Sequence, residues 1–180
     1  MKLIIQLPSR EEQLGFNRKR YAELLADPFV ASLPHRVETN HEGIMLMSPP
    51  PNFIHSQRCQ TINELLNRLL VAGKAYTAIP INTLDGVRAA DVGWLSSERQ
   101  LQAAQGAVLE IAPEICVEVR SSSNSDAEMT QKKTLYFEAG ADEVWICDEG
   151  VMHFYVPGDP MQARQTSLRC PDFPQKIEIK

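Results

Sequence analysis

A strand, a helix and a second strand follow one another late in the chain, and this unit constrains the fold more than any other feature. Ile115–Val119 is a nearly continuous apolar run, which is typical of a strand buried on both faces of a sheet. A capping pattern at residues 125–128 begins a helix that ends before Gly140, and residues 143–147 form a second buried strand. Such a unit predicts two parallel strands joined by a right-handed crossover. We therefore expect a mixed α/β domain.

The other segments add helices and strands around this unit. Capping and helical spacing of apolar residues predict helices over residues 9–26 and 55–71, the second ended by Gly73. Pro80 favours either an edge position or a bulge for a strand over residues 76–81. Further strands are expected over residues 44–47, 89–95 and 151–156, with a last short strand between residues 167 and 180.

The composition fits one acidic globular domain, which we expect to span residues 1–180. The net charge is -5 and the pI is 5.4, which argues against a protein that coats DNA non-specifically but permits a nuclease. No apolar run approaches the ~20 residues of a membrane-spanning helix, and the first apolar stretch is too short for a signal peptide. We expect a cytoplasmic protein without membrane contact. The four cysteines have no spacing typical of a zinc site or a disulfide framework.

Three charged residues stand where the pattern favours apolar side chains. Asp91 lies among small and apolar residues, Glu118 lies near the carboxyl end of a buried strand, and Lys132 lies centrally on an apolar helix face. Each has a structural alternative. Asp91 fits the exposed face of a half-buried strand, Glu118 fits a buried ion pair, and Lys132 fits a side chain that reaches out to solvent.

The order of the elements favours a shared site. The helix with Lys132 directly follows the strand with Glu118 and must pack on it, so the ammonium group is expected to meet the carboxylates. The carboxyl ends of strands are also where open α/β sheets bind ligands. Two carboxylates and a lysine suit Mg²⁺, which takes carboxylate oxygens and assists the hydrolysis of phosphodiesters.

Several blocks of sequence surround these residues. They read DVGWLSSER at residues 91–99, APEICVEVRS at 112–121, KKTLYFEAG at 132–140 and EVW at 143–145. Residues 42–49 with His55, and residues 170–174, supply a first hairpin, a helix start and a last strand. Together they resemble the bacterial family of putative restriction endonucleases in the PD-(D/E)XK superfamily. The resemblance covers almost the whole chain and implies a restriction endonuclease-like core, a mixed central β-sheet flanked by α-helices.

The resemblance also implies roles for particular residues. Asp91 and Glu118 match the metal ligands of the superfamily. Its lysine usually stands two residues after the Glu, where this chain has Arg120, but related families place it on the following helix, where Lys132 matches. A further acidic residue from the first hairpin often completes such sites, with Glu38 as the candidate and Glu42 behind it.

These observations predict an endonuclease that hydrolyses phosphodiester bonds in DNA with Mg²⁺ or Mn²⁺, and that forms a homodimer. Asp91, Glu118 and the carbonyl of Val119 are expected to bind the metal, and Lys132 to position the water or stabilise the phosphate. Residues expected to contact phosphate or line the site are Arg120, Arg88, His55 and Tyr136.

Two other classes stay open. The first is a catalytically inactive nuclease fold used for binding a partner. The second is a different hydrolase that uses His35, His41 or His55, although the chain has no G-x-S-x-G or H-E-x-x-H motif and no glycine loop that could hold a phosphate.

Overall fold

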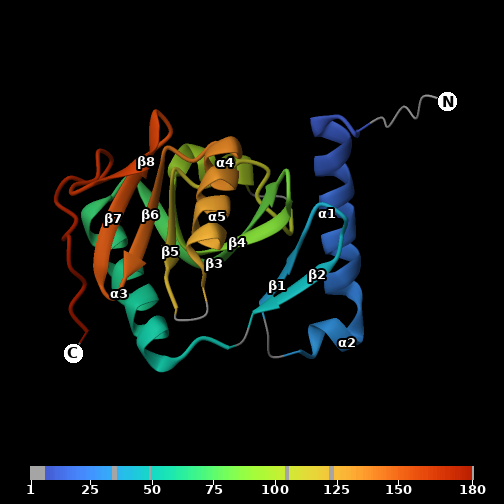
Figure 1. The fold of residues 1–180 in the computed structure, drawn as a ribbon, viewed down its shortest axis with the longest axis horizontal. Coiled ribbons are helices and arrows are strands. Elements are labelled where there is room, and N and C mark those ends of the chain that lie inside the picture. The colour runs from blue at the N-terminus through green and yellow to red at the C-terminus, as the bar shows by residue number, and fades with distance from the viewer. Residues whose placement is uncertain (1–6, 34–35, 49, 104–105, 122–123, 180) are drawn as a thin grey trace.

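The computed structural model describes residues 7–33, 36–48, 50–103, 106–121 and 124–179 (Figure 1). The helices in this part of the chain are α1 (Arg10–Ala26), α2 (Pro28–Ala31), α3 (Phe53–Leu69), α4 (Ser97–Ala103) and α5 (Asp126–Glu138). The strands are β1 (Arg36–Thr39), β2 (Met45–Ser48), β3 (Gly73–Thr83), β4 (Gly86–Ser96), β5 (Ile115–Val119), β6 (Glu143–Asp148), β7 (Val151–Val156) and β8 (Asp159–Arg164).

Six of these strands form one mixed sheet in the order β3-β4-β5-β6-β7-β8. The pair β5 and β6 is parallel and the other neighbours are antiparallel. The strand–helix–strand unit is thus confirmed, with α5 as its crossover. The expected α/β architecture, a mixed sheet flanked by helices, is also confirmed.

Helices cover both faces of this sheet, which explains the apolar runs of β5 and β6. Val117 and Trp145 pack into one core cluster with residues of α3. Cys116 and Val144 pack into another with residues of α5, which lies across the sheet in Figure 1. Because side chains alternate along a strand, a strand between two helical layers needs apolar residues at nearly every position. Glu118 breaks this rule on the α5 face.

Helix α5 begins as predicted, because the Ser125 side chain accepts a hydrogen bond from the backbone N–H of Glu128. Lys133, one position further along α5, would point to solvent if only the face with Lys132 packed on the sheet, but it does not. Its side chain is buried, and its ammonium group lies 3.9 Å from the centre of the Tyr155 ring. A cation is attracted to the face of an aromatic ring, which gives this lysine a structural role.

Helix α3 ends earlier than predicted, with Leu70 as its C-cap, and Gly73 instead begins β3. A side chain at Gly73 would lie 2.2 Å from the backbone oxygen of Leu95, so glycine is needed for the close approach of β3 to β4. Strand β3 lies at one edge of the sheet, which is the first of the two alternatives that Pro80 left open.

A separate two-stranded sheet, β1 with β2, lies beside α1 at the β3–β4 end of the molecule (Figure 1). It contacts the main sheet through β1 and β4. Gly86, at φ 86°, turns the chain between β3 and β4, and its Cα faces the carbonyl oxygen of Thr39 on β1. The hydroxyl of Thr39 in turn accepts a hydrogen bond from the backbone N–H of Val87, at 2.9 Å. These contacts fix β1 against β4.

The expected strand between residues 167 and 180 is wrong. Beyond β8, which the sequence did not predict, the described residues up to 179 form turns and one β-bridge, between Val151 and Lys176. The buried Glu143 holds this segment, since it accepts hydrogen bonds from the hydroxyl of Ser167 at 2.7 Å and from the backbone N–H of Leu168 at 2.7 Å. The Glu143 side chain therefore accepts hydrogen bonds that a neighbouring strand would accept if this segment were part of the sheet.

Candidate active site

The site lies where β4 and β5 move apart. Their backbone pairing ends at Val92 and Val117, although both strands continue. Beyond this point Asp91 joins β4 to β5 through its side chain, because Oδ2 of its carboxylate accepts a hydrogen bond of 2.8 Å from the backbone N–H of Val119. A carboxylate in this place is only 6% exposed. Asp91 is therefore not on the exposed face of a half-buried strand.

Glu118 points from β5 toward α5. Its Oε1 accepts a hydrogen bond of 2.6 Å from the hydroxyl of Tyr136, and its Oε2 lies 3.2 Å from the ammonium nitrogen of Lys132. Lys132 and Tyr136 are one helical turn apart, so both reach the same carboxylate. All three side chains are buried. The lysine therefore does not reach out to solvent.

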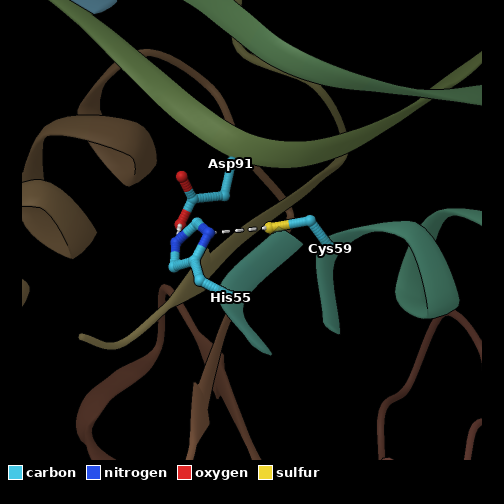
Figure 2. A group of neighbouring side chains, drawn as sticks. All are labelled: His55, Cys59 and Asp91. Carbon is cyan, nitrogen blue, oxygen red and sulfur yellow. Dashed lines mark hydrogen bonds and ion pairs between the residues drawn. The ribbon is translucent and has the colours of Figure 1, made fainter. Parts of the chain in front are cut away.

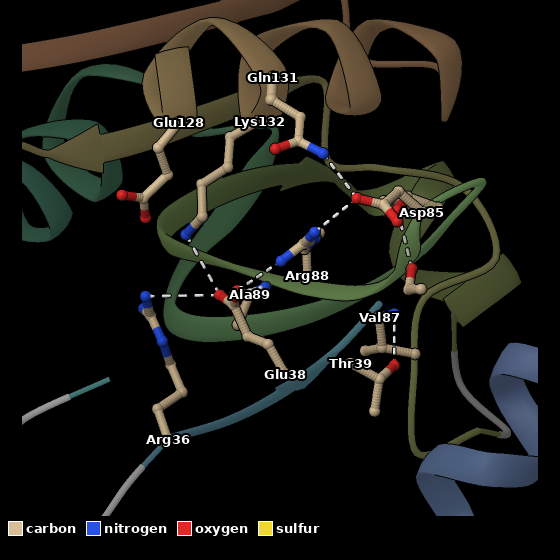
Figure 3. Close-up of polar contacts among 12 residues, drawn as sticks. Arg36, Glu38, Thr39, Asp85, Val87, Arg88, Ala89, Glu128, Gln131 and Lys132 are labelled. Atoms are coloured by element: carbon tan, nitrogen blue, oxygen red, sulfur yellow. Dashed lines mark hydrogen bonds and ion pairs between the residues drawn. The ribbon is translucent and has the colours of Figure 1, made fainter. Parts of the chain in front are cut away.

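Glu38 enters the site from β1. Its Oε1 accepts hydrogen bonds from the ammonium group of Lys132, at 3.2 Å, and from the backbone N–H of Ala89, at 3.0 Å. Figure 3 shows Lys132 and Glu38 meeting from opposite sides, with Arg36 and Arg88 next to the same carboxylate. Each of these arginines lies 3.6 Å from a Glu38 oxygen. Lys132 thus joins carboxylates from two separate sheets.

Two further side chains contact Asp91. The guanidinium group of Arg36 lies 2.6 Å from Oδ1, and Nε2 of His55 lies 3.3 Å from Oδ2 (Figure 2). Burial opposes the ionisation of Asp91, but the hydrogen bond from His55 and the charge of Arg36 outweigh it and lower the pKa of Asp91 to about 2. Asp91 is therefore an anion at neutral pH.

The two glutamates differ in protonation. Burial works against ionisation in both, but the charges of Lys132 and Arg36 keep the pKa of Glu38 below its ordinary value. For Glu118, burial outweighs the attraction of Lys132, and the charge of Asp91 adds to burial, so the pKa is raised to about 7. Glu38 is therefore the glutamate that stays ionised opposite Lys132, while Glu118 holds a proton until near neutral pH.

This difference predicts a pH dependence of stability in the metal-free protein. The unfolded chain releases the Glu118 proton near pH 4.5, whereas the folded protein retains it up to about pH 7. The free energy of unfolding should therefore fall as pH rises through this window, by about 3 kcal/mol in total. Urea unfolding at pH 5 and pH 8 with EDTA should show this fall in wild type. Glu118→Gln should lack this fall, and the exposed control Glu98→Gln should keep it. An equal fall in all three proteins would contradict the raised pKa of Glu118.

Most of the expected site residues lie together in the structure, but two do not. Asp91, Glu118, Lys132, Glu38, Val119, Arg88, His55 and Tyr136 lie together. Glu42 does not join them, because it is exposed in the turn between β1 and β2. The guanidinium group of Arg120 is engaged with Asp126 and Asp148, at 2.5 and 3.2 Å.

Of the histidines named in the other hydrolase class, His55 lies at the Asp91 carboxylate. Nδ1 of His41 lies 2.8 Å from Oδ1 of Asp85 on the surface, and His35 lies outside the described residues. All four cysteines are free thiols in the structure.

Sequence reasoning missed two members of the cluster. Arg36 stands two residues before Glu38 on β1, and this spacing puts both side chains on one face of a strand. Cys59 stands four residues after His55, which puts both on one face of α3. Both spacings are visible in the sequence, but they gain meaning only once β1 and α3 are known to face Asp91.

The mixed sheet, the flanking helices and this buried carboxylate–lysine cluster define an α/β domain of the restriction-endonuclease type. Over residues 22–178 the chain matches the Uma2 family, described as "Putative restriction endonuclease". The chain belongs to this family, as the sequence resemblance indicated.

Among solved structures, the chain is similar to a putative nuclease belonging to DUF820 from Anabaena variabilis ATCC 29413. The TM-score is 0.62 and the identity 18%, over 81% of this chain and 91% of the other, which supports the shared fold. A DrdV–DNA complex is similar with a TM-score of 0.41 and 13% identity, over 84% of this chain and 12% of the other. No curated protein matches the chain. In the described part of the chain, no helix combines the length and apolar character needed to cross a membrane.

Proposed function

We propose that this protein is a metal-dependent endonuclease that hydrolyses phosphodiester bonds in DNA, acting in the cytoplasm as a homodimer. The observation that carries the proposal is the position of Lys132, whose ammonium nitrogen lies 3.2 Å from both Glu38 and Glu118 beside the ionised Asp91. Membership of the restriction-endonuclease family supports the same chemistry.

The donor set fits a hard divalent cation. Asp91, Glu118 and Glu38 offer carboxylate oxygens, which Mg²⁺ and Mn²⁺ prefer, and the backbone carbonyl of Val119 adds another oxygen at the same strand end. When bound, such a cation neutralises charge on the phosphate and lowers the pKa of a water ligand.

The side chains around these carboxylates have separate tasks. The hydroxyl of Tyr136 and the ammonium group of Lys132 hold the two oxygens of Glu118 in fixed directions. Lys132 also brings a positive charge to the phosphodiester, where it holds the attacking water or stabilises the extra negative charge of the pentavalent phosphate. Arg36 and Arg88 supply further positive charge beside Glu38 for the DNA backbone.

Cleavage of a closed circular plasmid tests the proposal, because a circle has no ends for an exonuclease. We expect nicking with Mg²⁺ or Mn²⁺ and none with EDTA. Glu118→Gln should nick at least ~100-fold more slowly, whereas Glu98→Gln, the same change at an exposed site, should match wild type. Equal rates for both variants would place the activity elsewhere, and no nicking on circular or single-stranded DNA would overturn the proposal.

One observation favours a second candidate, a catalytically inactive nuclease fold that binds a partner. Arg36 already places a positive charge 2.6 Å from Asp91 and 3.6 Å from Glu38, where a cation would otherwise balance the carboxylates. In an inactive protein these ion pairs would be permanent. Calorimetric titration with Mn²⁺ separates the two candidates, because the enzyme must bind the ion and the inactive protein need not.

A further inference from the structure

A second group of potential metal ligands lies against the cluster, on the side of α3. His55 and Cys59 are four residues apart on this helix and face Asp91 on β4 (Figure 2). One ligand atom from each of the three residues lies within 4.8 Å of the others. The imidazole lies between its two neighbours, with Nδ1 3.5 Å from the Cys59 sulfur and Nε2 3.3 Å from Oδ2 of Asp91.

This donor set differs in chemistry from the oxygen ligands next to it. A nitrogen, a sulfur and one carboxylate oxygen are typical ligands of Zn²⁺, whereas Mg²⁺ does not favour thiolate. Tetrahedral zinc holds its ligand atoms about 3.5 Å apart. His55 meets its two neighbours through different nitrogens, whereas single ligand atoms from the three residues lie within 4.8 Å of one another. A rotation of the imidazole that turns one nitrogen toward both partners would bring the three atoms to the zinc spacing. Three protein ligands leave a fourth position for water.

We propose that His55, Cys59 and Asp91 bind a zinc ion. When the bond between sulfur and zinc forms, the Cys59 thiol gives up its proton to solvent, and no change in oxidation state is needed. Asp91 belongs to both donor sets, so an oxygen directed at zinc is withdrawn from the carboxylate cluster. Zinc therefore inhibits the nuclease; this last step rests on the proposed function, whereas the binding itself does not.

Cobalt(II) is the probe for the binding step, because it accepts the same ligands and a cobalt–thiolate bond gives a charge-transfer band in the near ultraviolet. We expect wild type to give this band with one equivalent of Co²⁺ and to lose it when Zn²⁺ is added. Cys59→Ser should lack the band, and His55→Ala should bind about 100-fold more weakly. His41→Ala, a histidine at the surface, is the matched control and should behave as wild type.

Two results overturn the zinc site: no band in wild type, or an unchanged band in Cys59→Ser, which would assign the thiolate to another cysteine. Inhibition is then read from binding of Mn²⁺ to the carboxylates by calorimetry, with and without one equivalent of Zn²⁺. We expect zinc to weaken Mn²⁺ binding about 10-fold or more, and unchanged Mn²⁺ binding would overturn the shared use of Asp91. Neither readout requires cleavage, so the zinc site can fail while the nuclease stands, or the reverse.

Discussion

Replacement of Lys132 by methionine is expected to reduce DNA cleavage by about 10²–10³-fold, because one preorganised positive charge is removed from the reacting phosphate. The same change should destabilise the fold by about 3 kcal/mol at pH 8, since two buried carboxylates lose their shared partner. At pH 6 the stability loss should be smaller, because Glu118, whose pKa is already about 7, then takes up a proton and no longer needs the ammonium group. Plasmid nicking and urea unfolding at both pH values measure these effects.

The neighbouring Lys133 offers a matched control. It is also buried on α5, but its ammonium group faces the ring of Tyr155 and not the carboxylates. Lys133→Met should therefore keep cleavage at the wild-type level, and its loss of stability relative to wild type should be the same at pH 8 and pH 6. If both variants lost cleavage equally, the loss would reflect damage to α5 and the role of Lys132 would be refuted.

Asp91→Asn should lower Mn²⁺ affinity and slow cleavage by on the order of 10³-fold, because a metal ion contributes several kcal/mol of charge stabilisation that the neutral amide no longer anchors. The amide oxygen can still accept the hydrogen bond from the backbone N–H of Val119, so the strand ends should keep their positions. The charge of Arg36 loses its closest partner. Calorimetry with Mn²⁺ and plasmid nicking measure the effects on the metal and the rate.

The acid limb of stability, which is the fall in the free energy of unfolding as pH drops, gives an independent test of the ionisation of Asp91. Its pKa is lowered to about 2, so its ionised form stabilises the folded protein above pH 4, and this contribution is lost as pH falls toward 2. In Asp91→Asn the corresponding loss, about 2 kcal/mol, should be absent. Asp159→Asn, at an exposed position on β8, should retain the wild-type acid limb and the wild-type cleavage rate. An unchanged acid limb in Asp91→Asn would refute the assigned ionisation.

The parts of the fold that follow from local rules could be predicted. The apolar runs of β5 and β6 and the capped helix between them predict a crossover, because a helix that joins two parallel strands packs on one face of both. The conformation of the segment after β8 could not be predicted in this way. Its backbone is held by the carboxylate of Glu143, and a side-chain partner more than 20 residues away leaves no periodic signal in the sequence.

The candidate site could likewise be predicted only in part. Asp91, Glu118 and Lys132 were found because each interrupts an apolar pattern, and the structure places them within one cluster. Burial of charge alone would not have identified the site, since Lys133 and Glu143 are equally buried and have structural partners. Arg36 and Cys59 depend on how β1 and α3 approach β4, which is a property of the tertiary structure and not of any one segment.

The separation of β4 and β5 has a consequence for detecting ligands. The backbone N–H groups of Val119 and Ala89 donate to the carboxylates of Asp91 and Glu38, and not to a neighbouring strand. An ion that draws on either carboxylate must therefore change the environment of one of these two amides directly. Their chemical shifts and hydrogen-exchange rates report on the occupancy of each carboxylate separately, with no substrate present. Val119 responds to any ion that uses Asp91, and Ala89 only to one that also uses Glu38, so the two amides together distinguish the magnesium-type site from the zinc site.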